Sequence, residues 1–250
     1  MSDVKDEVIR LAQKGYQEVV LTGIHLSSYG VDFKDSDHNL LSLIQSIHQV
    51  DGITRIRLGS LEPRIITEEF VQTLSGLWKV CPHFHLSLQS GCQETLERMN
   101  RRYTADEYRE KCQILRKYYE NPALTTDVIV GFPQESLEEF RESYEFVKEI
   151  QFYETHIFKY SRRKGTKADK MEGQIPEQEK TRRSEQMIAL GQERAFQYEN
   201  SFLGGKLDIL LEEEIQIDGK SYLTGHSREY IKAAVPAEGG WKINDCVCMI

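Results

Sequence analysis

The chain has 250 residues, of which 39% are hydrophobic and 29% charged, and its formal net charge is −8. This length accommodates one large domain, or a large domain and a small one. No apolar run approaches the roughly 20 residues of a membrane-spanning helix, and the charged amino terminus lacks the apolar segment of a secretory signal. We therefore expect a cytoplasmic globular protein without a membrane partner, and the acidic balance argues against a generic polyanion binder.

Five cysteines form an odd and scattered set: Cys81, Cys92, Cys112, Cys246 and Cys248. Such a set indicates reduced thiols rather than a disulfide framework. Cys246 and Cys248 are two residues apart in an expected strand and share a face. Because no second pair accompanies them, the sequence favours packing over metal binding there.

Helices and strands alternate through the first 200 residues. The first expected elements are a helix from its N-cap Ser2 to Gly15, a strand over 18–21, a helix over 40–47, a strand over 55–58, a helix capped by Thr67, and a strand over 84–88. The next are a helical segment after Gly91, a helix opened by the capping box Thr104/Glu107, a strand over 125–130, a helix opened by Ser136/Glu139, a strand over 155–158, and a long helix with Pro176 at its first position that ends near Tyr198.

Five strands alternating with helices predict an α/β fold with a parallel sheet or barrel. A full eight-unit barrel is excluded by the number of strands, so a partial parallel (β/α) barrel is expected. The chain begins with a helix where a βα series would begin with a strand, and we expect an upstream unit to be missing. The alternative, a five-stranded open sheet that is complete as it stands, remains open.

The sequence changes character after residue 200. Strands are expected over 206–213, 221–224, 230–235 and 241–249, with turns at Asp218-Gly219 and at 238–240. This is the size and strand content of a small all-β barrel. The predicted domains are therefore 1–199 and 200–250.

Polar side chains gather where the expected strand at 84–88 ends. Ser87, Gln89 and Ser90 lie at its carboxyl end, which is where ligands bind in strand–helix barrels. His83 and His85 share one face of the same strand. They form either a metal-binding pair or a hydrogen-bonded or solvent-facing pair, and the sequence leaves both interpretations open.

Residues 160–183 form a basic stretch in an acidic chain, with eight cations against four acidic residues. Its first cations are Arg162, Arg163 and Lys164. A local basic face is compatible with RNA binding, whereas the alternative is a solvated loop without a partner.

Several segments at strand ends together resemble the signature blocks of the radical-SAM methylthiotransferase family. These segments are LTGIHLSSYG, RIRLGSLEP, HLSLQSGC, ERMNRRYT and TTDVIVGFP. The carboxyl-terminal segment, with LTGHSREYIKAAV, resembles the TRAM domain that ends these enzymes and binds tRNA. The resemblance implies tRNA as partner and, within the TRAM-like part, His226 and Arg228 as RNA-binding residues.

The Thr22-Gly23-Ile24-His25 segment looks most like the branch that methylthiolates N6-threonylcarbamoyladenosine at position 37, next to the tRNA anticodon. Branches acting on isopentenyladenosine in tRNA or on a ribosomal protein remain alternatives. The resemblance implies S-adenosylmethionine and two [4Fe-4S] clusters in the full-length parent. The cofactor residues that it implies are Thr22, Gly23 and His25 at the methionine end, Ser87, Gln89 and Ser90 near the ribose or substrate, and Val130, Gly131 and Phe132 beside the adenine.

The family's CxxxCxxC cluster motif is absent from this sequence. Because three such cysteines hold the cluster in the family, we expect this chain to hold no cluster and to be inactive alone. For Val130, Gly131 and Phe132, a purely structural role at a buried strand end stays open. Two other functions also stay open, namely a cluster-free RNA-binding module and an unrelated α/β metabolic enzyme.

Overall fold

The computed structural model describes residues 1–33 and 38–249. Its larger part is built on parallel strands, which are β1 (Glu18–Leu21), β2 (Arg55–Leu58), β3 (His83–His85), β4 (Ala123–Val130) and β5 (Glu154–Lys159). β1 pairs with β2, and β3, β4 and β5 pair in that order. Isolated parallel bridges, Ile56 to Val80 and Leu61 to Leu86, join the two groups. The predicted partial parallel barrel is confirmed.

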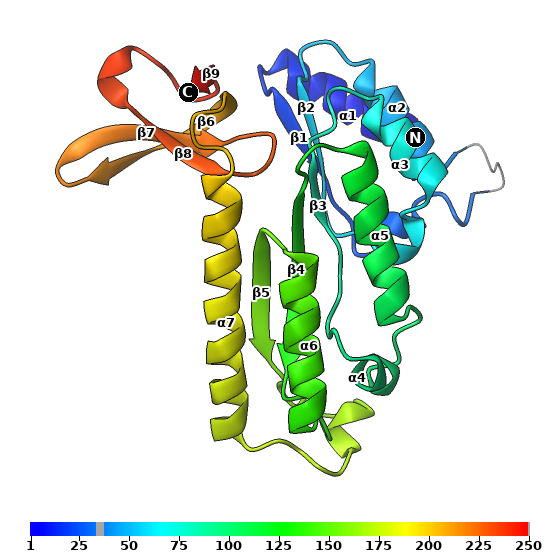
Figure 1. The fold of residues 1–250 in the computed structure, drawn as a ribbon. Coiled ribbons are helices and arrows are strands. Elements are labelled where there is room, and N and C mark those ends of the chain that lie inside the picture. Colours follow the sequence, from blue (N-terminus) through cyan, green and yellow to red (C-terminus); the bar gives the residue numbers. More distant parts are fainter. Residues whose placement is uncertain (34–37, 250) are drawn as a thin grey trace.

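Helices cover one side of these strands and flank their edge (Figure 1). They are α1 (Ser2–Gln13), α2 (Leu40–His48), α3 (Glu68–Ser75), α4 (Gln93–Arg98), α5 (Ala105–Tyr118), α6 (Leu137–Ile150) and α7 (Glu177–Asn200). Their apolar faces and the outward side chains of the strands form one continuous core, in which Ile44, Phe84 and Leu115 are fully buried. Side chains alternate along a strand, and several residues on the opposite, inner face are polar, among them Arg57, His85 and Asp127.

Side-chain caps set the starts of three helices as predicted. The hydroxyl of Thr67 accepts a hydrogen bond from Phe70 N, and reciprocal capping boxes open α5 at Thr104 and α6 at Ser136. Asn39 forms a further capping box at α2 that we did not predict. These bonds satisfy amide groups that a helix leaves without partners at its amino end.

Two predicted helix starts are wrong by one residue. The N-cap of α1 is Met1, which makes no side-chain cap, and Ser2 is already helical. Pro176 is itself the N-cap of α7, with extended ψ of 144°, and Glu177 is the first helical residue. The strand expected over 84–88 is also shorter in its regular part, because only residues 83–85 form a continuous ladder.

The carboxyl-terminal part is a four-stranded antiparallel sheet, which we call the β module (residues 207–249). Its strands are β6 (Leu207–Ile217), β7 (Lys220–His226), β8 (Lys232–Pro236) and β9 (Cys246–Met249), in the order β8-β7-β6-β9. Asp218 and Gly219, with φ of 50° and 77°, turn the β6–β7 hairpin as predicted, because both positions of this tight turn need positive φ. The last two strands begin later than expected, at Lys232 and Cys246.

The β module has a small core of its own around Ile209, Leu223 and Val247. Cys246 and Cys248 lie on either side of buried Val247, and both are exposed. They do share a face, but the expectation that they are packed in the interior is wrong. Their face of β9 points away from the module's core, because side chains alternate along a strand.

The β module packs against the amino ends of the parallel strands. Arg55, at the start of β2, donates hydrogen bonds to His226 O at 2.8 Å and Asp208 O at 2.6 Å. Ala123 and Tyr153, which precede or begin β4 and β5, bury apolar surface against Ile231 of the module. The module therefore closes the end of the partial barrel opposite to the carboxyl ends of its strands.

The helix α7 separates the β module from the loop 160–176, which holds the first cations of the basic stretch. The helix starts beside the loop 160–176, at the lower end of the molecule, and ends beside the β module at the upper end (Figure 1). Its 24 residues correspond to about 36 Å at 1.5 Å per residue. The two segments predicted to bind RNA thus lie at opposite ends of the fold. None of the described helices is long and apolar enough to cross a membrane.

Candidate cofactor and RNA site

A cavity of about 320 Å³ lies at the carboxyl ends of β1, β2 and β3. That volume is within the range of small-molecule sites, roughly 300–1,000 Å³. Its lining comes from four segments, and its polar members are His25, Ser27, Ser60, Glu62, Arg64, Ser87, Asn100, Arg101, Arg102 and Tyr103. The cavity carries more positive than negative side chains, which suits an anionic group such as a carboxylate or phosphate.

Direct contacts tie the loops around this cavity together. The hydroxyl of Ser27 accepts a hydrogen bond from Glu62 N at 2.9 Å, which joins the loops after β1 and β2. The Glu62 carboxylate faces His25 Nδ1 at 3.6 Å and pairs with Arg64 at 2.9 Å. The loops are thus held in one arrangement before any ligand binds.

Tyr103 fixes the third wall of the cavity. Its hydroxyl donates to the carbonyls of Ser87 and Leu88, at 2.9 and 2.7 Å. Burial raises the pKa of Tyr103 to about 12, so the hydroxyl keeps its proton and remains a donor at neutral pH. The segment 100–103 is held against the end of β3 by this contact.

The predicted cofactor residues fall into three groups in space. His25 and Ser87 line the carboxyl-end cavity, and Thr22 and Gly23 are exposed in the same loop as His25. Gln89 is held between Asp127 O and Ile129 N, each at 2.8 Å, with a φ of 72°. A glutamine rarely adopts such a backbone conformation, and strain of this kind tends to occur at functional sites.

The remaining predicted residues face the helices. Ser90 is fully buried, and its hydroxyl accepts from Cys92 N in a local turn. Val130 and Phe132 are buried, while Gly131 N donates to the Glu135 carboxylate at 2.7 Å. Positions 127 and 129 of β4 are the ones that face inward. A role for Val130, Gly131 and Phe132 beside the adenine stays a prediction.

The predicted RNA-binding residues are divided between two places. Arg162, Arg163 and Lys164 are exposed in the loop after β5, where Arg162 pairs with Asp169 at 3.1 Å. Arg228 instead reaches from the β module to Val80 O at 2.9 Å. His226 is half-buried beside Glu212. Both residues of the module therefore lie at its contact with the barrel.

A second cavity, of about 570 Å³, runs along the inner face of the strands. At its floor, the ring of Tyr230 stacks between His83 at 4.4 Å and His226 at 4.6 Å. Above the floor, Asp127 contacts both His85 and His156, and hydrogen bonding by His85 is the main cause that lowers the Asp127 pKa. Sequence reasoning missed Asp127 and His156. Their signal was the alternation of polar residues along β4 and β5.

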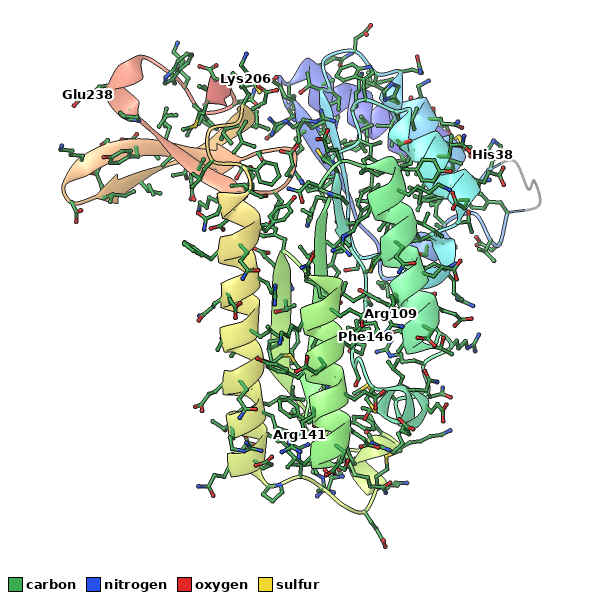
Figure 2. All side chains as sticks on the ribbon, viewed as in Figure 1. His38, Arg109, Arg141, Phe146, Lys206 and Glu238 are labelled. Carbon is green, nitrogen blue, oxygen red and sulfur yellow. The ribbon has the colours of Figure 1, made fainter. Side chains whose placement is uncertain are left out.

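A further cavity, of about 580 Å³, lies on the helical side between α5 and α6. There the guanidinium of Arg109 lies over the ring of Phe146, 5.0 Å from its centre (Figure 2). The polar lining of this cavity consists mainly of exposed carboxylates. We assign it no function.

Residues 1–147, more than half of the chain, match the family model of the radical SAM superfamily. This chain belongs to the radical SAM superfamily. Solved radical SAM structures share the fold: coproporphyrinogen III oxidase (HemN) from Escherichia coli superposes with a TM-score of 0.54 at 14% identity, over 81% of this chain and 44% of that one. Methylornithine synthase (PylB) gives 0.53 at 14% identity, over 78% and 52%.

Curated relatives narrow the similarity to tRNA methylthiotransferases. The threonylcarbamoyladenosine tRNA methylthiotransferase MtaB of Bacillus subtilis (strain 168) is 40% identical over 91% of this chain and 51% of its own length. MtaB of Aquifex aeolicus (strain VF5) is 39% identical over 89% and 54%. The tRNA-2-methylthio-N(6)-dimethylallyladenosine synthase of Thermodesulfovibrio yellowstonii is 37% identical over 91% and 51%. The resemblance found in the sequence is confirmed, and the chain spans about half the length of these relatives.

Membership of the radical SAM superfamily implies S-adenosylmethionine and a [4Fe-4S] cluster as cofactors. The residues present are suited to bind S-adenosylmethionine but not the cluster. The carboxyl-end cavity has the size and the cationic groups for the methionine carboxylate. For the cluster, no three cysteines come together among the described residues, and Cys81, Cys92 and Cys112 are buried. The exposed thiols Cys246 and Cys248 are only two, and cluster ligation uses thiolates. The chain's own cysteines do not form a cluster site.

Anaerobic treatment of this radical SAM chain with iron and sulfide is therefore expected to give no stoichiometric [4Fe-4S] cluster. S-adenosylmethionine should bind weakly, because contacts to the cluster iron are lacking and only protein contacts remain. Iron analysis with visible absorbance checks the first expectation, and calorimetry checks the second. A content of about four irons per chain that is lost on changing Cys92 to Ser would show that the chain's own thiols bind a cluster, and would contradict the first expectation. Micromolar affinity for S-adenosylmethionine would contradict the second expectation.

Proposed function

We propose that this chain is the barrel and RNA-binding part of a tRNA methylthiotransferase that 2-methylthiolates N6-threonylcarbamoyladenosine next to the anticodon. Identities of 34–40% to relatives named for that reaction support the choice of branch. The observation that carries the proposal is the carboxyl-end cavity, which four of the five family-like segments line together.

The proposed role of the chain is to bind and orient. In this family, bound S-adenosylmethionine supplies the methyl group and is the source of the radical. The strained backbone of Gln89 supports the proposal that Gln89 lies beside the cofactor. His25 and Ser87 would contact the cofactor from two walls of the cavity. The chemistry also needs the family's two clusters, for which this chain's residues have no site, so we assign no chemical step to its side chains.

Cations around the carboxyl ends of the strands support tRNA as the substrate. Arg64, Arg101 and Arg102 rim the cavity and are exposed. Within the described part of the chain, the side chains of Arg163 and Lys164 have no ion-pair partner. Phosphate contacts supply most of the non-specific affinity for nucleic acid, and no ion pair competes for Arg163 and Lys164. We propose that the anticodon stem binds at these cations, at the carboxyl ends of the strands. The β module, with His226 and Arg228 near its edge, would make a TRAM-like contact with another part of the same tRNA.

Disruption of the gene tests the whole function. We expect 2-methylthio-N6-threonylcarbamoyladenosine to disappear from the cell's tRNA, while N6-threonylcarbamoyladenosine accumulates. Mass spectrometry of tRNA nucleosides measures both. Loss of the methylthio group from dimethylallyladenosine instead would assign the other tRNA branch, and an unchanged nucleoside profile would refute both assignments.

Changing Arg162, Arg163 and Lys164 together to alanine should weaken tRNA binding and make it less dependent on salt. Each lost phosphate contact reduces the salt slope by about 1, so a fall of roughly 2 to 3 is expected. Filter binding of unmodified tRNA at several salt concentrations measures the slope.

The matched control removes three cations of the outer helices, by changing Lys111, Lys117 and Lys148 to alanine. These residues belong to α5 and α6, which cover the strands (Figure 1). The net charge changes equally in the two variants. Equal loss of affinity in both would mean that only overall charge matters, and would refute a specific contact by the basic loop.

A further inference from the structure

Three side chains from neighbouring strands meet on the inner face of the sheet. His85 of β3, Asp127 of β4 and His156 of β5 each offer a ligand atom, and these atoms lie within 4.8 Å of one another. The strand register explains the meeting, because Asp127 is directly opposite His156, while His85 is opposite Thr125 two residues earlier. All four positions alternate toward the same face.

The separations are close to those of ligands around one metal ion. His85 Nε2 is 3.5 Å from Asp127 Oδ2, and His156 Nδ1 is 3.2 Å from Asp127 Oδ1. Nitrogen and oxygen ligands about 2.1 Å from a tetrahedral zinc ion are about 3.4 Å apart. The rings of His85 and His156 stack with their centres 5.7 Å apart, and the side chain of His156 is 52% exposed.

A neighbouring hydroxyl orients His85 for this role. Thr125 Oγ1 lies 3.0 Å from His85 Nδ1, so with a metal ion in the cluster the proton of His85 would sit on Nδ1 and be donated to Thr125, and the Nε2 lone pair would bind the ion. Metal-binding histidines generally have such a partner at the other nitrogen. Glu154 lies 3.9 Å from His156 Nε2 and provides a further carboxylate at the edge of the cluster.

We infer that His85, Asp127 and His156 form a binding site for a divalent first-row transition metal such as Zn²⁺ or Co²⁺. Two imidazoles and a carboxylate suit these metals. Three protein ligands leave coordination positions open toward the inner cavity of about 570 Å³, where an oxygen ligand from solvent or a bound molecule can occupy them. The site is separate from the carboxyl-end cavity and does not rest on the proposed function.

The test titrates the chelator-treated chain with Co²⁺ and, separately, with Zn²⁺. One equivalent of Co²⁺ should give visible d–d absorption without the charge-transfer band of a thiolate ligand, and Zn²⁺ should displace it. Asp127→Asn and His156→Gln should each weaken binding by about tenfold or more. Thermal melting by circular dichroism checks that the variants are folded, and His156→Gln changes a side chain that is 52% exposed.

Two control variants remove other candidate ligands. Glu142→Gln alters the second group that could hold an ion, Cys92, Glu94 and Glu142, and a double change of Cys246 and Cys248 to serine removes the exposed thiols. Both controls should keep full binding. Absence of stoichiometric binding, binding unchanged in Asp127→Asn, or binding lost in either control would overturn the assignment.

Discussion

Replacing Arg183 with alanine is expected to lower the free energy of unfolding by about 3–5 kcal/mol, the usual cost of removing one partner of a buried ion pair. Arg183 of α7 pairs with Glu135 at 2.6 Å, and the two side chains are only 5% and 1% exposed. Arg183 also donates to Glu135 O at 2.9 Å. The variant leaves a buried carboxylate without its cation, and chemical denaturation measures the loss.

The pH dependence of this loss identifies its cause. Burial raises the pKa of Glu135 above its ordinary value even with Arg183 beside it. A raised pKa in the folded state means that folded Glu135 binds its proton more tightly than Glu135 in the unfolded chain. The free-energy cost of burying the charged carboxylate therefore appears as pH rises through the folded-state pKa of Glu135. The Arg183→Ala deficit should therefore shrink as pH falls from neutral toward the ordinary range of a glutamate.

Arg182→Ala is the matched control for Arg183→Ala. Arg182 is the preceding residue of the same helix, and its side chain is 47% exposed and pairs with Glu179 at 2.7 Å. An exposed pair of this kind contributes at most about 1 kcal/mol. Equal destabilisation by the two variants, or a deficit that does not change with pH, would contradict the buried-charge explanation.

Changing Arg55 and Arg57 together to alanine is expected to release the β module from the barrel. Both side chains are nearly buried, and besides the contacts of Arg55, Arg57 donates to Ser227 O at 3.1 Å and pairs with Glu18 at 2.9 Å. Hydrogen bonds from charged donors contribute about 1.5–3 kcal/mol each. Differential scanning calorimetry should show a separate early transition for the module in the variant and one transition in the wild type.

The linker between α7 and β6 gives a second measurement of the same release. Residues 203–206 are exposed, and cleavage there by a protease should become faster once the module moves freely. Lys232→Ala serves as control, because Lys232 makes an exposed ion pair with Glu213 within the module. A double variant that melts in one transition and resists cleavage like the wild type would show that these arginines do not hold the interface.

The sequence was sufficient for features that depend on neighbours along the chain. The caps Thr67, Thr104 and Ser136 and the Asp218-Gly219 turn were predictable, because each bond or backbone angle involves residues at most three apart. The parallel α/β class of the fold followed from the alternation of strands with helices. The family resemblance came from short blocks at strand ends, where the carboxyl-end cavity indeed formed. Ser2 and Pro176 were misplaced by one residue, since a single cap position depends on backbone angles that composition does not fix.

Tertiary structure alone decided what the inner face and the β module contact. Asp127 and His156 come together with His85 only through the register of three strands that are far apart in the sequence. Arg228, expected on an RNA surface, reaches back to the barrel, because the module packs on the amino ends of the strands. The sequence also could not place that module about 36 Å from the basic loop. A local pattern determines which face a side chain takes, but which faces meet depends on how the elements pack.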